Sequence, residues 1–184
     1  GYYFNSFVNL SLRTPNINSY EVENLFNGSY YTIAIKFLKS DIFDISGNYS
    51  LIEFSSSSYT FRISIKTENN SIELYNYGEN RNTITQTFSN VLQKSTMKDK
   101  WIHICLVMYD NKNPRLYIKN DENYLVYISD EDDTGDFELI KEEETDYDND
   151  PAHYIGGNSE GNFLGYIQSI HILKEFSANE DQVN

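Results

Sequence analysis

The chain has 184 residues, a net charge of −14, sixteen tyrosines and only three prolines. Its length suits one domain with a single core, and its aromatic and isoleucine content favours strands over disorder. No apolar run approaches the roughly eighteen residues that a membrane helix needs, so we expect no direct membrane insertion.

The negative charge is concentrated in one segment. Residues 130–150 contain twelve acidic residues and one lysine, a net charge of −11. The rest of the chain is nearly neutral and has no basic stripe for a phosphate backbone, so we expect no nucleic-acid partner. Because like charges repel, residues 130–150 are predicted to form a solvated loop.

Alternating apolar and polar residues predict eleven strands along the chain. For example, Phe61, Ile63 and Ile65 alternate with Arg62 and Ser64, as on a strand with one wet face. The predicted strands cover residues 5–12, 30–40, 49–55, 59–68, 71–77, 84–92, 101–110, 115–120, 124–129, 153–156 and 162–174. Without a longer amphipathic helix, these strands predict an all-β jelly-roll sandwich of two antiparallel sheets.

Two features near the C-terminus refine this fold. Ser177 and Glu180 have the spacing of a capping box and predict a short C-terminal helical turn. The apolar rhythm changes phase between Ile167 and Ile170, so we expect a bulge or a close approach near Gly165. The predicted core includes Trp101, Ile104, Leu106, Ile118, Ile155, Phe163 and Ile167.

The segment Trp101-Ile102-His103-Ile104-Cys105 holds the only tryptophan, the only cysteine and one of three histidines. Trp101, His103 and Cys105 share one strand face, and both faces are largely apolar, so we expect a strand buried on both sides. A zinc site needs three or four ligands, and the chain lacks paired ligand spacings. Catalysis would need an exposed thiolate. Cys105 is therefore predicted to be inert and His103 structural.

Two segments resemble a known group of domains. "MKDKWIHICLVMYDNKNPRLYIKND" and "YIGGNSEGNFLGYIQSIHILKEFSANEDQV" are similar to laminin G-like and pentraxin-like lectin domains of the concanavalin A-like superfamily. The resemblance implies one domain over residues 1–184, with the acidic loop 130–150 inserted between strands. In pentraxins the cysteine pairs with one on an earlier strand, whose counterpart here is Ala34.

Pentraxin calcium ligands follow the Ile-Gly step, where this chain has Asn158, Ser159 and Glu160. The resemblance therefore implies a weak Ca²⁺ site at Asn158 and Glu160, helped by Asp148 or Asp150, because hard cations need six or more oxygens. EF-hand spacing fails in the acidic segment, since position twelve from Asp130 is Lys141. No other cofactor is expected.

The function that we expect is non-catalytic recognition of a glycan by a domain of a larger extracellular or cell-surface protein. A glycoside hydrolase on the same fold would need two paired carboxylates, and the predicted strands offer only Glu53, Glu68 and Glu73. Sandwich lectins bind sugars through aromatic faces and amides on loops. The candidate ligand-binding residues are Tyr75, Tyr77, Asn80, Asn158 and Glu160. The alternatives are a protein–protein adhesion domain and a structural spacer.

Overall fold

The computed structural model describes residues 2–4, 31–38, 42–44, 46–56, 59–78, 84–109, 112–121, 125–128, 152–157, 163 and 165–174. These residues form eleven strands, one α-helix and one 3-10 helix. The strands are β1 Tyr2–Phe4, β2 Tyr31–Leu38, β3 Asn48–Ser56, β4 Tyr59–Lys66, β5 Ser71–Gly78, β6 Ile84–Phe88, β7 Ile102–Tyr109, β8 Lys112–Asn120, β9 Leu125–Ile128, β10 Ala152–Ile155 and β11 Gly165–Lys174. The helices are α2 Lys94–Met97 and η1 Thr67–Asn69.

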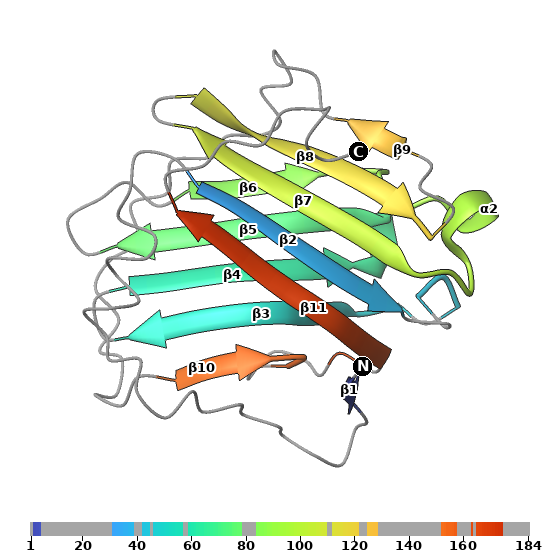
Figure 1. Ribbon diagram of the computed structural model, residues 1–184, viewed down its shortest axis with the longest axis horizontal. Coiled ribbons are helices and arrows are strands. Elements are labelled where there is room, and N and C mark those ends of the chain that lie inside the picture. The colour runs from blue at the N-terminus through green and yellow to red at the C-terminus, as the bar shows by residue number, and fades with distance from the viewer. Residues whose placement is uncertain are drawn as a thin grey trace.

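The strands form two antiparallel sheets, which confirms the predicted all-β sandwich (Figure 1). The six-stranded sheet has the order β1-β11-β2-β7-β8-β9, and the five-stranded sheet has the order β10-β3-β4-β5-β6. Ten of the predicted strands coincide with observed ones. The predicted strand 5–12 and the helical turn at Ser177 and Glu180 lie outside the described residues.

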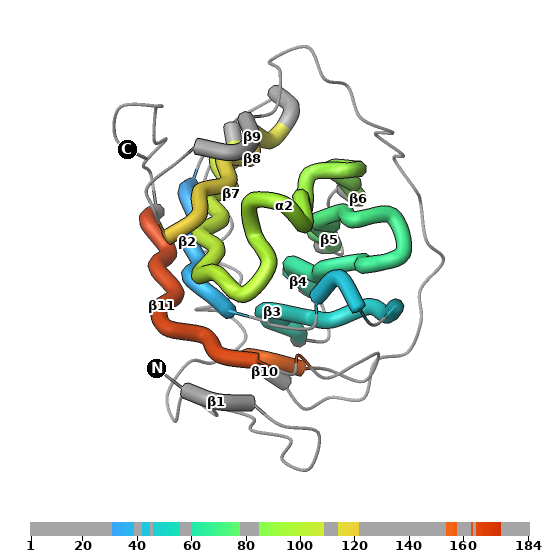
Figure 2. The backbone as a smooth tube through the Cα atoms, turned by 90° about the vertical axis from the view of Figure 1, so that its right-hand side faces the viewer, coloured from blue at the N-terminus to red at the C-terminus, as the bar shows by residue number. Residues whose placement is uncertain are grey.

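The core lies between the two sheets, which face each other in Figure 2. The alternation of apolar and polar residues explains the position of this core, because every second residue of each strand points inward. Phe61, Ile63 and Ile65 of β4 are at most 1% exposed. The Phe37 and Phe163 rings meet edge to face, with centroids 5.7 Å apart. The predicted inward faces of these strands are therefore correct.

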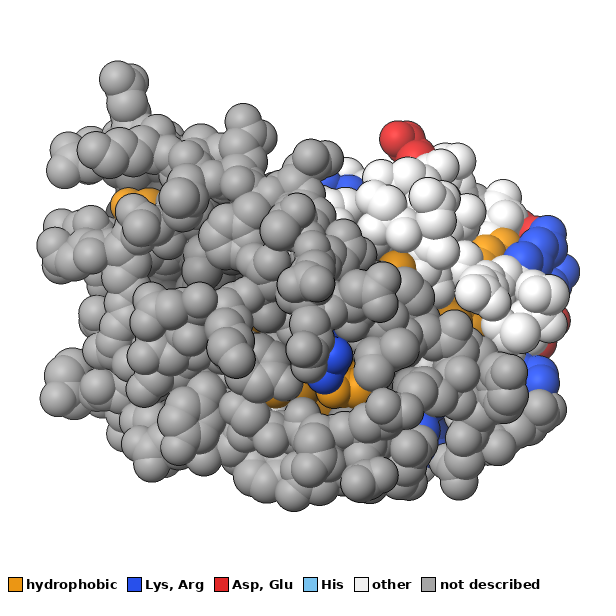
Figure 3. Space-filling model, turned by 90° about the horizontal axis from the view of Figure 1, so that it is seen from above, with side chains coloured by type: hydrophobic (Ala, Val, Ile, Leu, Met, Phe, Trp, Pro, Cys, Tyr) orange, Lys and Arg blue, Asp and Glu red, His pale blue; other side chains and the backbone are white. Residues whose placement is uncertain are grey.

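The connection from β6 to β7 passes from one sheet to the other at one end of the sandwich, where α2 lies (Figures 1 and 2). Met97 anchors α2 in the core with 1% exposure. On the solvent side, Lys94 and Lys98 contact Asp44 at 3.1 Å and 3.7 Å. Figure 3 shows basic and acidic side chains close together at this end of the molecule.

The close approach predicted at Gly165 is present. A Cβ at this position would lie 2.4 Å from the carbonyl oxygen of Leu38 and 3.0 Å from the Phe163 ring. The register between β11 and β2 shifts between Ile167 and Ser169, where the predicted bulge is found. Gly165 is therefore required because β11 and β2 approach too closely for any side chain.

Two predicted core residues differ from the expectation. Ile104, Leu106, Ile118, Phe163 and Ile167 are buried as predicted. Ile155 is only partly buried, although it packs against the core. The prediction for Trp101 is wrong, because Trp101 is half-buried, precedes β7 and contacts Lys36 and Tyr166 on the outer face of the six-stranded sheet.

Candidate functional site

The described part of the chain includes two of the predicted ligand-binding residues, Tyr75 and Tyr77. Both lie on β5 rather than on a loop, and both are half-buried. They point away from the core, because the alternate residues Ile72 and Leu74 are buried in it. The remaining candidates lie outside the described residues: Asn80, Asp148, Asp150, Asn158 and Glu160.

The strands that flank these residues show where the chain approaches and leaves the sheet. β10 begins at Ala152 opposite Ser55, and the backbone N–H of Gly156 donates to the carbonyl of Leu51. β5 ends at Gly78, at the same end of the sheet as Ala152. Asp148 and Asp150 thus precede this end of the sheet, and Asn80 follows it. Asn158 and Glu160 instead follow the other end of β10.

The outer face of the five-stranded sheet presents a cluster formed by Glu53, Arg62 and Tyr75, here called the Arg62 cluster. Glu53 is opposite Arg62, and Arg62 is opposite Tyr75, across three neighbouring strands. The Arg62 guanidinium lies 5.2 Å from the centre of the Tyr75 ring and 3.8 Å from a Glu53 carboxylate oxygen. An aromatic ring, a planar cation and a carboxylate are therefore adjacent on one sheet face, although Glu53 is only 8% exposed.

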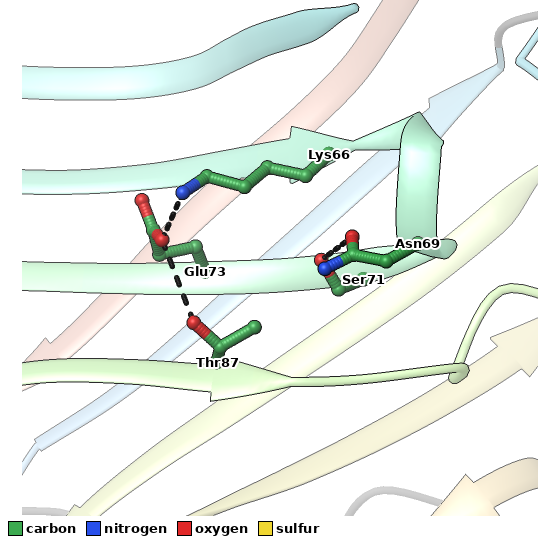
Figure 4. Close-up of polar contacts among 5 residues, drawn as sticks. All are labelled: Lys66, Asn69, Ser71, Glu73 and Thr87. Carbon is green, nitrogen blue, oxygen red and sulfur yellow. Dashed lines mark hydrogen bonds and ion pairs between the residues drawn. The ribbon is translucent and has the colours of Figure 1, made fainter. Parts of the chain in front are cut away.

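A second polar group lies on the same face, toward the other end of β5 (Figure 4). Lys66 of β4 donates to the carboxylate of Glu73, and the Thr87 hydroxyl of β6 lies 3.5 Å from the same oxygen. The Ser71 hydroxyl donates to the Asn69 side-chain oxygen at 2.5 Å. The cross-strand contacts of Lys66 and Thr87 compensate the charge of Glu73, whose residue exposure is only 8%.

Sequence reasoning missed Arg62 and Glu53 as site residues. The pattern placed Arg62 on the wet face of its strand but did not show that Glu53 and Tyr75 flank it. That juxtaposition depends on the register of β3, β4 and β5, which joins residues distant in the sequence. The signal available was a charged residue at an outward position of a central strand.

The two buried strand carboxylates, Glu53 and Glu73, are not neighbours on the sheet face. Glu53 and Glu73 are separated by β4 and by two residues of register. Strand spacings place their Cα atoms about 12 Å apart. Glu53 interacts with Arg62, and Glu73 interacts with Lys66. Among the described residues, no group of three or more His, Cys, Asp or Glu could hold a metal ion.

The strand that carries His103 and Cys105 is fully buried on its inner face, and on its outer face it is partly buried at these two positions and fully buried at Val107. Ile102, Ile104 and Leu106 are at most 1% exposed, whereas His103 and Cys105 are half-buried. The prediction of burial on both sides is therefore wrong at these positions. Burial nevertheless raises the pKa of the Cys105 thiol to about 11, which disfavours the reactive thiolate.

The surroundings of His103 lower the pKa of its imidazole. Burial is the largest influence lowering its pKa, and the positive charges of Lys36 and Lys119 add to it, while Asp121 opposes it.

No helix in the described part of the chain is long and apolar enough to cross a membrane.

No protein-family model matches this sequence, and no curated protein does so. Solved structures do resemble it. The receptor-binding domain of botulinum neurotoxin mosaic serotype C/D is 17% identical, with a TM-score of 0.54 over 88% of this chain and 37% of that chain. The chain thus spans well under half of that domain.

The Ruminococcus gnavus IT-sialidase CBM40 is 11% identical, with a TM-score of 0.55 over 99% of this chain and 92% of that one. The same domain bound to α2,3 sialyllactose matches at 10% identity with the same TM-score and coverage. These likenesses define the class of fold, an all-β sandwich. The resemblance to laminin G-like and pentraxin-like domains stays a prediction.

Proposed function

We propose that this chain is a non-catalytic glycan-recognition module that binds sugar through the Arg62 cluster on the outer face of the five-stranded sheet. The observation that carries the proposal is the position of the Arg62 guanidinium, 5.2 Å from the Tyr75 ring centre and 3.8 Å from Glu53. A tyrosine ring offers an apolar face for a sugar ring, and charged groups beside it bond sugar hydroxyls. The CBM40 structure with sialyllactose supports a glycan ligand.

Tyr77 extends the surface along β5, where it is opposite Thr60. In the proposal, Asn80 continues this surface beyond Gly78, and the Asn158–Glu160 turn contributes from the end of β10. The proposal includes a weak Ca²⁺ site with oxygen ligands from Asn158 and Glu160, to which Asp148 or Asp150 would add a ligand from the chain that precedes β10. A bound Ca²⁺ would supply positive charge that attracts sugar hydroxyl oxygens.

The proposed context is a single laminin G-like or pentraxin-like domain, residues 1–184, of a larger extracellular or cell-surface protein. The non-catalytic part of the proposal is supported by the carboxylates, since Glu53 and Glu73 are each engaged by a cation and lie on strands separated by β4. A protein-adhesion domain is the second candidate, because β11 exposes Tyr166 and Leu173, at 40% and 45%, on the outer face of the other sheet.

The test is a glycan array with and without calcium, followed by titration of any bound glycan into variants. Tyr75→Ala should abolish binding, and Arg62→Lys should weaken it about tenfold, since lysine keeps the charge but loses the planar donor fork. Lys94→Gln on α2, where Lys94 pairs with Asp44 outside the outer faces of both sheets, is the control and should bind normally.

Binding that survives Tyr75→Ala would place the site elsewhere and defeat the proposal. An array without any bound glycan, together with capture of one defined protein partner, would favour the adhesion domain. Hydrolysis of an array glycan would refute the non-catalytic assignment.

A further inference from the structure

Three residues that can carry positive charge form one cross-strand row on the outer face of the six-stranded sheet. Lys36 of β2 is opposite His103 of β7, and His103 is opposite Lys119 of β8. Adjacent strands lie about 4.8 Å apart, so the three side chains leave the sheet side by side. This cationic row is notable in a chain of net charge −14 with only 14 Lys and Arg residues.

Aromatic rings border the cationic row. The Lys36 ammonium lies 5.7 Å from the centre of the Trp101 ring, and the Trp101 and Tyr166 ring centroids are 6.5 Å apart. Tyr166 is 40% exposed, whereas Lys119 is only 4% exposed. A ligand on this face would therefore touch Lys36, His103 and the two rings. Lys119 is almost fully buried, so its positive charge would attract an anion without touching it.

His103 supplies an independent observation. Its Nε2 atom is buried and has no hydrogen-bond partner. A buried polar atom without a partner is uncommon and costs free energy, so it requires an explanation. The charged groups that face His103 are Lys36, Lys119 and Asp121. An anion beside Lys36 would lie next to the half-buried His103 ring and would be attracted by both lysines, and a hydrogen bond from Nε2–H would require the groups that cover this atom to move aside.

We infer that this face is a second recognition site, which binds a sulfate or carboxylate group carried by a small saccharide. The anion would contact Lys36 and His103, and the sugar ring would pack on Tyr166 and Trp101. The row contains only two lysines and one histidine on a strongly negative chain, which favours a single charged sugar over a long polyanion. The site is distinct from the Arg62 cluster, because the two lie on the outer faces of different sheets.

Calorimetric titration with a sulfated disaccharide, its unsulfated parent and a uronate-bearing disaccharide tests this inference. We expect a charged sugar to bind, and the unsulfated parent to bind about tenfold more weakly, as for loss of one charge-assisted contact. Lys36→Gln should weaken binding of the charged sugar about tenfold as well. The control Lys94→Gln removes the same charge from α2 and should bind like the wild type.

NMR titration of the His103 imidazole provides a second readout that does not depend on a variant. A bound anion stabilises the imidazolium, so the charged sugar should raise the His103 pKa. Preference for the sulfated or the uronate sugar identifies the source of the anion. Equal binding of the charged and unsulfated sugars, equal effects of Lys36→Gln and Lys94→Gln, or an unchanged His103 pKa would each overturn the inference. Tyr75→Ala should leave this binding intact, so failure here is distinguishable from failure of the Arg62 cluster.

Discussion

Ala34 of β2 and Cys105 of β7 are directly opposite each other in the six-stranded sheet. This is the position at which the pentraxin resemblance expected the partner of the cysteine. Directly opposed residues in an antiparallel pair have Cα atoms about 4.5–5.5 Å apart, within the range that a disulfide spans. The register therefore places a cysteine introduced at residue 34 within disulfide range of Cys105.

Ala34→Cys should therefore form a disulfide with Cys105 under mild oxidation and raise the melting temperature. The closed loop is long, so the stabilisation is at most about 4 kcal/mol. Non-reducing mass spectrometry and thermal melts measure both effects. Lys36→Cys is the control, because residue 36 is opposite His103 and only diagonal to Cys105. Equal cross-linking from both positions would contradict the register.

Cys105 in the native protein should react slowly with thiol reagents. Its pKa of about 11, against an ordinary value of 9.0, lowers the thiolate fraction about a hundredfold near pH 8. Half-burial should slow the reaction further. The measurement compares the labelling rates of native and urea-unfolded protein. Similar rates in the two states would show that the thiol is neither shielded nor shifted.

Gly165→Ala should destabilise the fold by about 3 kcal/mol, because the new methyl group would collide with a backbone carbonyl that cannot move cheaply. The obstacle is the Leu38 oxygen, 2.4 Å from the added Cβ. Gly47→Ala is a matched control, since its Cβ would meet the Tyr49 hydroxyl at 2.9 Å, the far end of a side chain. Urea unfolding measures the loss of stability in both variants. Equal losses would refute the explanation that a backbone collision at residue 165 causes the destabilisation.

The sequence predicted inward faces well, because alternation is a local property of each strand. Ile63 of β4 is an example, identified from its neighbours alone and 1% exposed. The Arg62 cluster was not predictable in this way. Its three members come from β3, β4 and β5, and their proximity depends on which strands pair and in what register.

Trp101 shows a second limit of prediction from the sequence. Apolar residues on both faces of its segment indicated a strand buried on both sides. In the structure, Trp101 packs beside Lys36 and Tyr166 on the outer face instead. Hydrophobicity shows that a side chain needs contacts, but a cation and a ring on the surface can provide them as well as a core.

Loss of Trp101 should accordingly cost less than loss of a core ring. Phe163→Ala, at a residue that is fully buried against Phe37, should cost about 3–5 kcal/mol. Trp101→Ala should cost about 1–2 kcal/mol, in proportion to its partial burial. Chemical denaturation of the two variants compares these losses. A greater loss of stability for Trp101→Ala than for Phe163→Ala would show that Trp101 stabilises the fold as a core residue does.

Acidification should destabilise the protein through His103. The folded-state pKa of His103 lies below its ordinary value of 6.5, chiefly because of burial and then because of Lys36 and Lys119. As the pH falls through 6.5, the unfolded chain binds a proton that the folded chain resists. The stability associated with neutral His103 is therefore complete above this pH and is lost as the pH falls through the folded-state pKa.

His103→Gln should reduce the loss of stability between pH 7.5 and pH 5.5, measured by urea unfolding in dilute buffer without sulfate. His171→Gln, at an exposed position of β11, is the control and should lose stability as the wild type does. A charged disaccharide at the cationic row should oppose the effect in the wild type, because a bound anion stabilises the imidazolium. An identical pH dependence for the wild type and His103→Gln would show that His103 does not control acid stability.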